Sequence, residues 1–462
     1  MEPLGKVSYA PLGPSVGSQA RLPQRAKTSM SSTILIRGGR VIDPAQEIDE
    51  IVNVAIRDGC IAAIGRQAPT SADEVVDATG LLVTPGLIDM HVHLREPGYE
   101  EDETIETGTA AAVAGGFTAV ACMPNTDPPL DNDAAIEFVL RQAARTAAAR
   151  VYPIGALTEG RQGKELAEIG LMVRAGAVAF SDDGDGVADA GVCLRAMRYL
   201  SMFERLFIQH CDEPSLSRGG CMNAGPTATR LGLPGIPAIA EVVMVQRDLT
   251  LAAQANVRYH VAHISTAGAV ELVRAAKRKG QRVSAEVTPH HLLLTDEACA
   301  TYDTNYKMNP PLRSRADVQA CLEAVRDGTI DCLVTDHAPH GRESKEHEFQ
   351  YASAGIIGLE TALPLFIRAL IEPGLVTWPR LIAAMSTRPA ELLGVGGGTL
   401  KVGQPADVTL IDPQTEWTID PERMRSKSRN TPFAGWKVRG RALGTLVNGQ
   451  WRYRDEQLIK RG

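Results

Sequence analysis

The chain has 462 residues, of which 44% are hydrophobic and 22% charged, and its formal net charge is −7. This is enough apolar material for one large core and a smaller module. A pI near 5.9 without any run of basic residues argues against a nucleic-acid or anionic-membrane surface. No apolar stretch approaches the roughly 20 residues that cross a bilayer. We therefore expect a small-molecule partner, no nucleic acid and no membrane.

Eight cysteines are spread along the chain without a CxxC pair, the pattern of a compartment in which thiols stay reduced. We expect a cytoplasmic protein. Residues 1–29 contain several Pro, Gly and Ser residues and four basic side chains, so residues 1–31 are predicted to be a disordered N-terminal extension. The prolines argue against the amphipathic helix of a transit peptide, and a true start at Met30 is the alternative.

Short β-like runs separated by Gly and Asp-Gly turns occupy residues 32–84, and the same pattern returns in residues 395–462. Two such segments at opposite ends of a chain most simply pair with each other. We predict that they form one small β-sandwich domain that flanks the central residues.

Residues 85–394 alternate short apolar runs with helical segments, such as those over 104–114 and 132–149. Repeated strand and helix over about 300 residues is typical of a (β/α)8 TIM barrel, with an open doubly wound sheet as the competitor. Polar residues recur at the ends of several predicted strands, where a barrel keeps its active site. We therefore predict an α/β barrel, with strands near residues 118–121, 150–154, 177–180, 206–209, 258–264, 283–287 and 332–335.

The motif HVHLREPG at residues 91–98 directly follows an apolar run. Side chains two apart on a strand share a face, so His91, His93 and Arg95 can converge. Two imidazoles suit zinc or a related ion, and a guanidinium binds a carboxylate through two parallel hydrogen bonds. A bare HxH is more often two surface histidines, but the Arg, Pro and Gly that follow favour a metal site with an anion clamp.

Other predicted strands also end in metal-ligand residue types: Asp182 and Asp183, His210, His263 and Asp336. A lone His at such a place is more often a hydrogen-bonded structural group, and a lone Asp is more often a helix cap. Together with the strand that carries His91 and His93, five predicted strands end this way, and capping does not readily explain so many. With His91 and His93, the set has enough ligands for two metal ions that share a carboxylate.

The ordered motifs resemble class I dihydroorotases of the amidohydrolase superfamily, and the resemblance runs from Ile34 to about Tyr453. The matching segments are residues 91–98, 115–118, 123–126, 180–184, 210–213, 263–266, 308–313, 335–340 and 355–360.

The resemblance implies that His91, His93 and Asp336 hold one metal ion, and that His210 and His263 hold a second. Asp183 is the implied bridge, with Asp182 as the alternative. Related hydantoinases and allantoinases commonly use a carboxylated lysine as the bridge, but residues 180–184 contain no lysine. A plain carboxylate is therefore expected. Zinc, one or two ions per subunit, is the expected cofactor, and manganese or cobalt could serve in the same geometry.

The family's substrate contacts correspond to Arg95, Asn125, Asn309 and His340. Dihydroorotate carries a carboxylate on a cyclic imide-like ring, which needs a cationic fork, amides and one more donor. Divalent ions lower the pKa of a water between them and polarise the ring carbonyl, with Asp336 as the implied general base. The implied activity is the reversible, water-releasing cyclisation of N-carbamoyl-L-aspartate to L-dihydroorotate in pyrimidine biosynthesis.

The remaining histidines are predicted to be structural. His260 lies three residues before His263, so strand alternation points it away from that ligand. His290 and His291 are expected to be structural, His337 to orient its neighbours, and His347 to lie in a solvated loop. The chain departs from the family at Glu100–Glu103, where an acidic run stands in place of an expected lysine, and local surface contacts should differ there.

Three rival functions remain. A hydantoinase-like or allantoinase-like cyclic amidase would share the fold and metals but should lack the set Arg95, Asn125 and Asn309. A scaffold for aspartate transcarbamoylase, without activity, should have lost metal ligands, and so should a relative of the brain-type dihydropyrimidinases. All six implied ligands are present here. A complex with aspartate transcarbamoylase alongside catalysis is compatible with the sequence, and we expect a homodimer.

Overall fold

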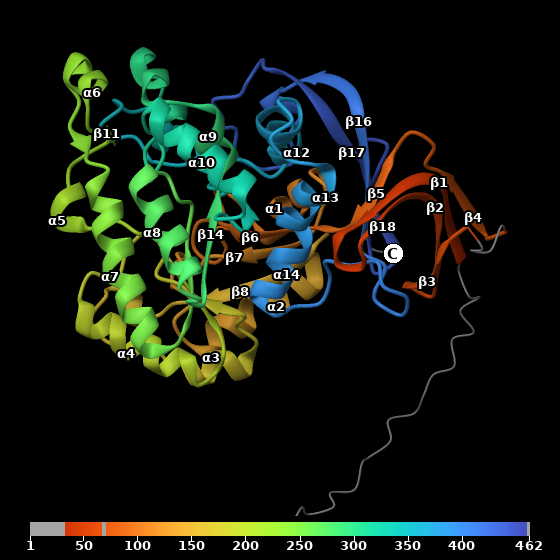
Figure 1. Cartoon of the computed structure of the whole chain (residues 1–462), viewed down its shortest axis with the longest axis horizontal. Helices are drawn as coiled ribbons and strands as arrows, with labels where there is room; N and C mark the ends of the chain where they lie inside the picture. The colour runs from red at the N-terminus through yellow and green to blue at the C-terminus, as the bar shows by residue number, and fades with distance from the viewer. Residues whose placement is uncertain (1–32, 67–70, 460–462) are drawn as a thin grey trace, which may run out of the picture.

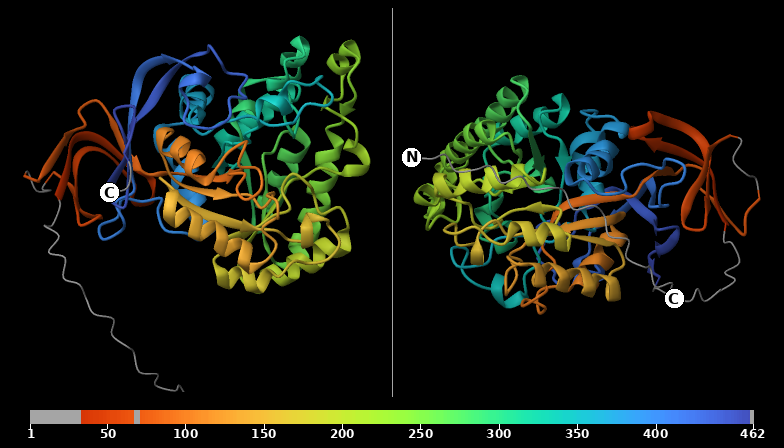
Figure 2. Two further views of the ribbon diagram at one scale, coloured as in Figure 1. Left: turned by 180° about the vertical axis from the view of Figure 1, so that it is seen from behind. Right: turned by 90° about the horizontal axis from the view of Figure 1, so that it is seen from below.

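The computed structural model describes residues 33–66 and 71–459, so the extension predicted for residues 1–31 lies outside the described residues. A parallel barrel ringed by helices forms one end of the molecule, and a mostly antiparallel β-sheet module, in which β1 pairs in parallel with β4 and β5, forms the other (Figure 1). The views from behind and from below show the two parts side by side (Figure 2). The first and last strands of the described chain, β1 and β19, both belong to the sheet module.

Eight parallel strands form the barrel wall, and each pairs with the next in the order β6-β7-β8-β9-β10-β13-β14-β15. Parallel strands are covered on both faces, which is why their sequences are nearly continuous apolar runs. In β7, for example, all six residues are buried. The strand bounds are β6 Leu87–Val92, β7 Phe117–Cys122, β8 Arg150–Gly155, β9 Ala179–Phe180, β10 Leu206–Gln209, β13 Arg258–Val261, β14 Val283–Val287 and β15 Cys332–Leu333.

The last strand returns to the first. Just beyond β15, His337 pairs in parallel with Val92 at the end of β6. The His93 backbone N–H donates to the carbonyl of His337 over 2.8 Å. An open doubly wound sheet has no such link between its edges, so the predicted barrel is confirmed and the open-sheet alternative is wrong.

Helices connect the strands, and polar caps fix where several of them begin. Thr104, Asn132, Thr266 and Ser314 each accept a hydrogen bond from a first-turn backbone N–H, which satisfies a donor that the helix leaves unpaired. The helix bounds are α1 Ile105–Ala114, α2 Asp133–Thr146, α3 Ile169–Ala175, α4 Ala190–Ser201, α5 Pro214–Ser217, α6 Pro226–Leu231, α7 Ile239–Ala255, α8 Ala267–Arg278, α9 Pro289–Leu293, α10 Arg315–Asp327, α11 Arg342–Lys345, α12 Ala362–Phe366, α13 Trp378–Ile382 and α14 Arg388–Leu393. A small two-stranded sheet, β11 Met222–Asn223 and β12 Gly235–Ile236, lies between α5 and α7.

The second sheet has the order β19-β18-β17-β16-β5-β1-β2-β3, with β4 paired to β1. Antiparallel pairing of β5 with β16 joins the two chain ends, as predicted. The bounds are β1 Thr33–Asp43, β2 Ile48–Arg57, β3 Cys60–Gly65, β4 Glu74–Asp77, β5 Leu82–Pro85, β16 Val408–Thr418, β17 Lys437–Val447, β18 Gln450–Arg454 and β19 Gln457–Leu458.

Side-chain alternation separates the two faces of the barrel wall. On β10, Leu206 and Ile208 belong to a buried apolar cluster that also includes Met90 and Val334, whereas Phe207 belongs to the cluster that packs against the helices. The sheet module has its own apolar cluster, which includes Ile36, Val54 and Leu446 among others. Among the described residues, no helix combines the length and hydropathy of a membrane span.

Candidate metal centre and active site

All six predicted metal ligands lie at or just beyond the carboxyl ends of barrel strands, the face on which barrel enzymes carry their sites. His91 is in β6 and His93 follows it, Asp183 follows β9, His210 follows β10, His263 follows β13 and Asp336 follows β15. Each of the six side chains is buried. Five separate strands therefore contribute to one enclosed cluster.

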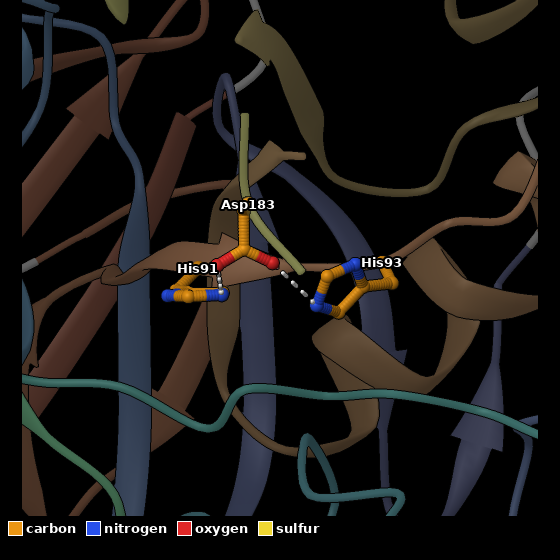
Figure 3. Close-up of side chains that lie close together, drawn as sticks. All are labelled: His91, His93 and Asp183. Carbon is orange, nitrogen blue, oxygen red and sulfur yellow. Dashed lines mark ion pairs between the residues drawn. The ribbon is translucent and has the colours of Figure 1, made fainter. Parts of the chain in front are cut away.

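The first ligand group consists of His91, His93 and Asp183 (Figure 3). The Nε2 atom of His91 lies 3.4 Å from Asp183 Oδ1, and the Nε2 atom of His93 lies 3.5 Å from Asp183 Oδ2. Each carboxylate oxygen thus faces a different imidazole. This arrangement leaves a space between three donor atoms.

The second ligand group consists of Asp183, His210 and His263. His263 Nε2 lies 3.5 Å and His210 Nδ1 lies 3.9 Å from Asp183 Oδ1, and the two ring nitrogens are 2.9 Å apart. Asp183 belongs to both groups, which is the geometry expected of a bridging carboxylate.

Asp336 lies beside the first group. Its Oδ1 atom is 3.0 Å from His93 Nε2 and 3.5 Å from His91 Nε2. The carboxylate is therefore close enough to join these histidines around one ion.

The donor set fits a divalent metal ion. His91 Nε2 and Asp183 Oδ1 are buried and have no hydrogen-bond partner among the described residues, and such atoms are rare unless an ion or water completes them. Donors that bind one tetrahedral zinc ion at about 2.0–2.2 Å lie about 3.3–3.6 Å from each other. The nitrogen–oxygen separations of the first group agree with that spacing.

Burial and neighbouring charges set the protonation of the cluster. Burial raises the pKa of Asp183, but His91 and the other imidazoles outweigh it and hold this pKa well below its usual range. Burial lowers the pKa of His91, but Asp183 and Glu286 raise it well above its ordinary value. Burial and the neighbouring His263 lower the pKa of His210 to about 4, so its imidazole is neutral at pH 7, the form that binds metals.

Asp182 and Asp183 have different surroundings. Asp182 Oδ1 accepts hydrogen bonds from the backbone N–H groups of Leu157 (2.8 Å) and Thr158 (3.1 Å), and its Oδ2 accepts from the Thr158 hydroxyl. Its carboxylate is therefore occupied by the β8 loop. Only Asp183 of this pair lies among the histidines.

Three site residues adopt left-handed backbone conformations. The φ angles are 61° for Arg95, 29° for His263 and 49° for Asp336. Such conformations cost about 1–3 kcal/mol each for residues other than glycine and often mark functional sites. At His263, which lies two residues beyond the end of β13, strand alternation no longer decides where the side chain points.

The four predicted substrate residues surround the cluster. Arg95 and His340 meet at 3.3 Å, and Arg95 Nε donates to the Pro339 carbonyl over 3.0 Å. Asn125 Oδ1 lies 2.8 Å from His93 Nδ1, and Asn309 Nδ2 lies 3.2 Å from His210 Nε2. The structure thus brings together a guanidinium, an imidazole and two amides around the predicted metal ligands.

Comparison with known proteins assigns the family. A family model described as "Dihydro-orotase-like" matches residues 80–269. A dihydroorotase of Syntrophotalea carbinolica is 52% identical over 421 residues, covering 91% of this chain and 99% of that protein. A dihydroorotase of Syntrophus aciditrophicus is 49% identical, covering 92% of this chain and all of that protein. The chain belongs to the dihydroorotase family.

Two solved structures share the fold of this dihydroorotase-family chain. The L-hydantoinase (dihydropyrimidinase) from Arthrobacter aurescens superposes with a TM-score of 0.84 at 26% identity, covering 93% of this chain and 98% of that one. The dihydropyrimidinase from Brevibacillus agri superposes with a TM-score of 0.81 at 24% identity, covering 92% and 96%. The latter likeness concerns the fold alone.

Glu286 was not predicted as a site residue, yet it lies directly beside the predicted metal ligands of this dihydroorotase-family chain. It is fully buried on β14, its Oε1 lies 2.5 Å from His91 Nδ1, and its Oε2 lies 3.0 Å from His260 Nε2. His260 in turn contacts the Ser284 hydroxyl at 2.7 Å. The signal in the sequence was a carboxylate in a buried parallel strand, where an unpaired charge would be expensive.

Arg161 is a second residue that the sequence did not reveal. Its Nη2 donates to the backbone carbonyl of Asp183 and to the Asp185 carboxylate, each over 2.7 Å. It lines a pocket of about 500 Å³ that reaches His210 and includes Arg218. His210 is the predicted metal ligand in its lining, and a separate pocket of about 570 Å³ is lined by His340. A larger cavity of about 660 Å³, lined by Glu360 and Trp417 among others, contains none of the predicted metal ligands.

The other predicted structural histidines have distinct environments. His291 Nδ1 contacts the Thr288 hydroxyl at 2.8 Å and its Nε2 contacts the Pro310 carbonyl at 3.0 Å, next to Asn309. His290 is buried, and neither ring nitrogen has a hydrogen-bond partner among the described residues. His347 is exposed, as predicted.

His337 and the acidic run are linked inside the protein. His337 Nδ1 accepts from the Gly358 N–H at 3.0 Å, and its Nε2 lies 3.4 Å from Glu103. The acidic run was expected to alter surface contacts, but Glu103, its last member, is fully buried. The expectation is therefore wrong for Glu103, whose carboxylate makes its contacts inside the protein.

Proposed function

We propose that this chain is a zinc-dependent class I dihydroorotase, which converts L-dihydroorotate and water reversibly to N-carbamoyl-L-aspartate. The observation that carries the proposal is one buried carboxylate, Asp183, shared by two pairs of histidines next to the Arg95–His340 pair. Identities of 46–52% to curated dihydroorotases over nine-tenths of the chain support the same substrate. In the cell, the cyclisation direction serves pyrimidine synthesis.

Substrate binding is assigned to Arg95, His340, Asn125 and Asn309. The Nε atom of Arg95 donates to the Pro339 carbonyl, which holds the guanidinium with its Nη2 3.3 Å from His340 Nε2. A fixed guanidinium is well suited to a carboxylate such as that of dihydroorotate. The amides of Asn125 and Asn309 would then hydrogen-bond the polar ring atoms.

Proton transfer is assigned to Asp336. His91, His93 and Asp336 would hold one ion, and His210 and His263 the other, with Asp183 between them. When bound, the metal makes hydroxide available at neutral pH and polarises the ring carbonyl. Asp336 accepts the proton of the attacking water and delivers it to the ring nitrogen, as the carbon–nitrogen bond breaks and the new carboxylate forms.

Steady-state turnover of L-dihydroorotate and N-carbamoyl-L-aspartate, with metal content measured on the same sample, tests this function. We expect turnover that is lost on chelation and restored by zinc. Metal-bound protein without turnover would overturn the substrate assignment. Protein with neither metal nor turnover would indicate a scaffold.

A cyclic amidase acting on hydantoin or allantoin is the second candidate, because the solved structures with the same fold include hydantoinases. The two differ at the carboxylate, which hydantoin lacks. Arg95→Met should raise the KM for dihydroorotate about 10- to 100-fold, since a hydrogen-bonded charge pair contributes about 1.5–3 kcal/mol. Turnover of hydantoin above that of dihydroorotate would favour the second candidate.

Assembly, location and domain limits are parts of the same proposal. All eight cysteines are free, which supports a reducing cytoplasm. We extend the proposal to a homodimer and a complex with aspartate transcarbamoylase, which sizing chromatography of the protein alone and with the transcarbamoylase tests. The proposed domains are the barrel, residues 85–394, and one module made of residues 32–84 and 395–462.

A further inference from the structure

Asn430 comes from the C-terminal part of the chain, between β16 and β17, yet its side chain lies among the backbone groups of the catalytic face. It is 5% exposed. Its Nδ2 donates to the carbonyls of Ala338 and Gly355, each over 3.0 Å, and its Oδ1 accepts from the His340 N–H over 3.2 Å. The Asn430 amide therefore forms three hydrogen bonds, two to the segment at 338–340 and one to the segment at 354–355.

These two segments hold His340 from opposite sides. The segment at 338–340 carries its backbone, and the Pro339 carbonyl there accepts from Arg95 Nε over 3.0 Å. The segment at 354–355 contacts its ring, because His340 Nε2 lies 2.8 Å from the Ala354 carbonyl. Asn430 bridges the segments, so its amide fixes the distance between the backbone of His340 and the group that orients its ring.

The residues just before Asn430 hold the neighbouring loop. The Ser426 hydroxyl and the Lys427 N–H donate to the buried carboxylate of Glu103, the latter over 3.1 Å. The Ser428 hydroxyl donates to the Asp102 carbonyl over 2.7 Å. Asp102 also accepts from the Gly341 N–H at 2.6 Å, directly after His340. Residues 426–430 thus tie the loop after β6 to the loop after β15, which together carry Arg95 and His340.

We propose that Asn430 is a positioning residue that sets the geometry of the Arg95–His340 pair for the substrate carboxylate. The C-terminal part of the chain thereby contributes to substrate affinity. The inference rests on the proposed function, in which that pair binds the carboxylate. The side-chain hydrogen bonds of Asn430 go to the backbone of Ala338, His340 and Gly355, none of which is a predicted metal ligand. Its effect should therefore fall on KM, whereas the metal and Asp336 continue to set kcat.

Asn430→Ala in the full-length, zinc-loaded protein tests the inference. The variant keeps the backbone bond from the Ile357 N–H to the Asn430 carbonyl (2.9 Å) and loses all three side-chain bonds. We expect KM to rise about tenfold in both reaction directions, because small displacements of a positioning group have large effects, with kcat and zinc content nearly unchanged. A purely structural role would lower the active fraction, and hence kcat, without moving KM.

Two further variants sharpen the test. Asn53→Ala on β2 removes one side-chain bond, to the Gly38 N–H (3.1 Å), in the same sheet module and should leave KM at the native value. In the double variant Asn430→Ala/His340→Ala, KM should rise by less than the product of the two single effects, because one of the two groups that Asn430 positions, the His340 ring, is already absent. Independent, multiplying effects on KM would overturn the inference.

Hydrogen exchange gives a readout that needs no substrate. The His340 N–H donates to Asn430, so exchange at residues 338–341 should accelerate in Asn430→Ala and stay native in Asn53→Ala. Unchanged exchange at 338–341 would overturn the inference alone. Native protein that binds zinc but does not turn over dihydroorotate would overturn the proposed function, and with it the substrate role of Asn430.

Discussion

Single residues in this site combine burial with specific partners, and Asp336 is the clearest case. It is the carboxylate closest to His93 and has a left-handed backbone, a conformation that its surroundings must maintain. The neighbouring His337 is anchored on both sides, by Gly358 and Glu103. The position of Asp336 is thus determined by the loop that carries it, and its chemistry can be altered without altering that loop.

Asp336→Asn should lower kcat about 10²- to 10⁴-fold, because an amide cannot accept and return the proton of the attacking water. The melting temperature should stay within a few degrees of the native value. Asp331→Asn, near the start of β15, is the matched control: Asp331 pairs with Lys277 and Arg388 far from the ligands, so the control should lose stability and keep kcat. Native-like kcat in Asp336→Asn would contradict the assigned role.

Glu286 is a second single-residue case, but it contacts the predicted ligand His91 and not the substrate. A carboxylate that accepts from the second nitrogen of a metal-binding imidazole fixes its tautomer and its orientation. Glu286→Gln should weaken zinc affinity about 10- to 100-fold, measured by competition with a chelator. Ser284→Ala removes only the outer contact to His260 and should have a much smaller effect. Equal zinc affinities in native protein and Glu286→Gln would show that Glu286 is not needed for orientation.

At the scale of elements, the loop entering α12 meets residues 425–426 through Glu360. Its Oε1 accepts from the Arg425 N–H over 2.6 Å and from the Ser426 N–H over 3.2 Å. Burial raises the pKa of Glu360 from 4.5 to about 7. The folded protein therefore favours the protonated form of Glu360. The stability that this protonation contributes is lost as pH rises through the folded-state pKa of about 7.

Glu360→Gln should change how stability depends on pH. Between about pH 4.5 and 7 the native fold binds more protons at Glu360 than the unfolded chain, so this group lowers stability as pH rises through that window. Glutamine stays neutral and keeps an acceptor oxygen. We expect the variant to gain about 1–3 kcal/mol relative to native protein on going from pH 4.5 to 7, measured by urea unfolding. A difference that is constant across this pH range would contradict the raised pKa.

Element boundaries show what the sequence could predict. The strands at 206–209 and 283–287 have the predicted bounds, because their apolar runs are bracketed by polar or turn residues. The run at 332–335 forms a strand only over Cys332–Leu333, and the run at 258–264 only over Arg258–Val261. In both places the backbone leaves the strand early and turns a ligand, Asp336 or His263, inward through a positive φ. Hydrophobic periodicity contains no information about that turn.

At the scale of the whole molecule, the contacts that could not be predicted join parts distant in the chain. Glu286 and His91 are 195 positions apart, and Asn430 and His340 are 90 apart. The six predicted ligands lie together because strand ends of a barrel converge on one face, whatever their separation in sequence. The supporting residues follow no such rule, since each depends on how loops and modules pack around the finished barrel.

The same convergence predicts that the metal stabilises the entire fold. The ligands come from five strands between residues 91 and 336, so the complete site exists only when the barrel has formed. An ion that binds the folded state alone stabilises it by about 1.4 kcal/mol for each tenfold rise in free ion above its Kd. The melting temperature should therefore fall on chelation and rise linearly with the logarithm of free zinc. The variant His210→Ala/His263→Ala lacks the second ligand pair, so its melting temperature should rise less steeply with the logarithm of free zinc. A melting temperature of the native protein that does not change with zinc would contradict a metal centre at this position.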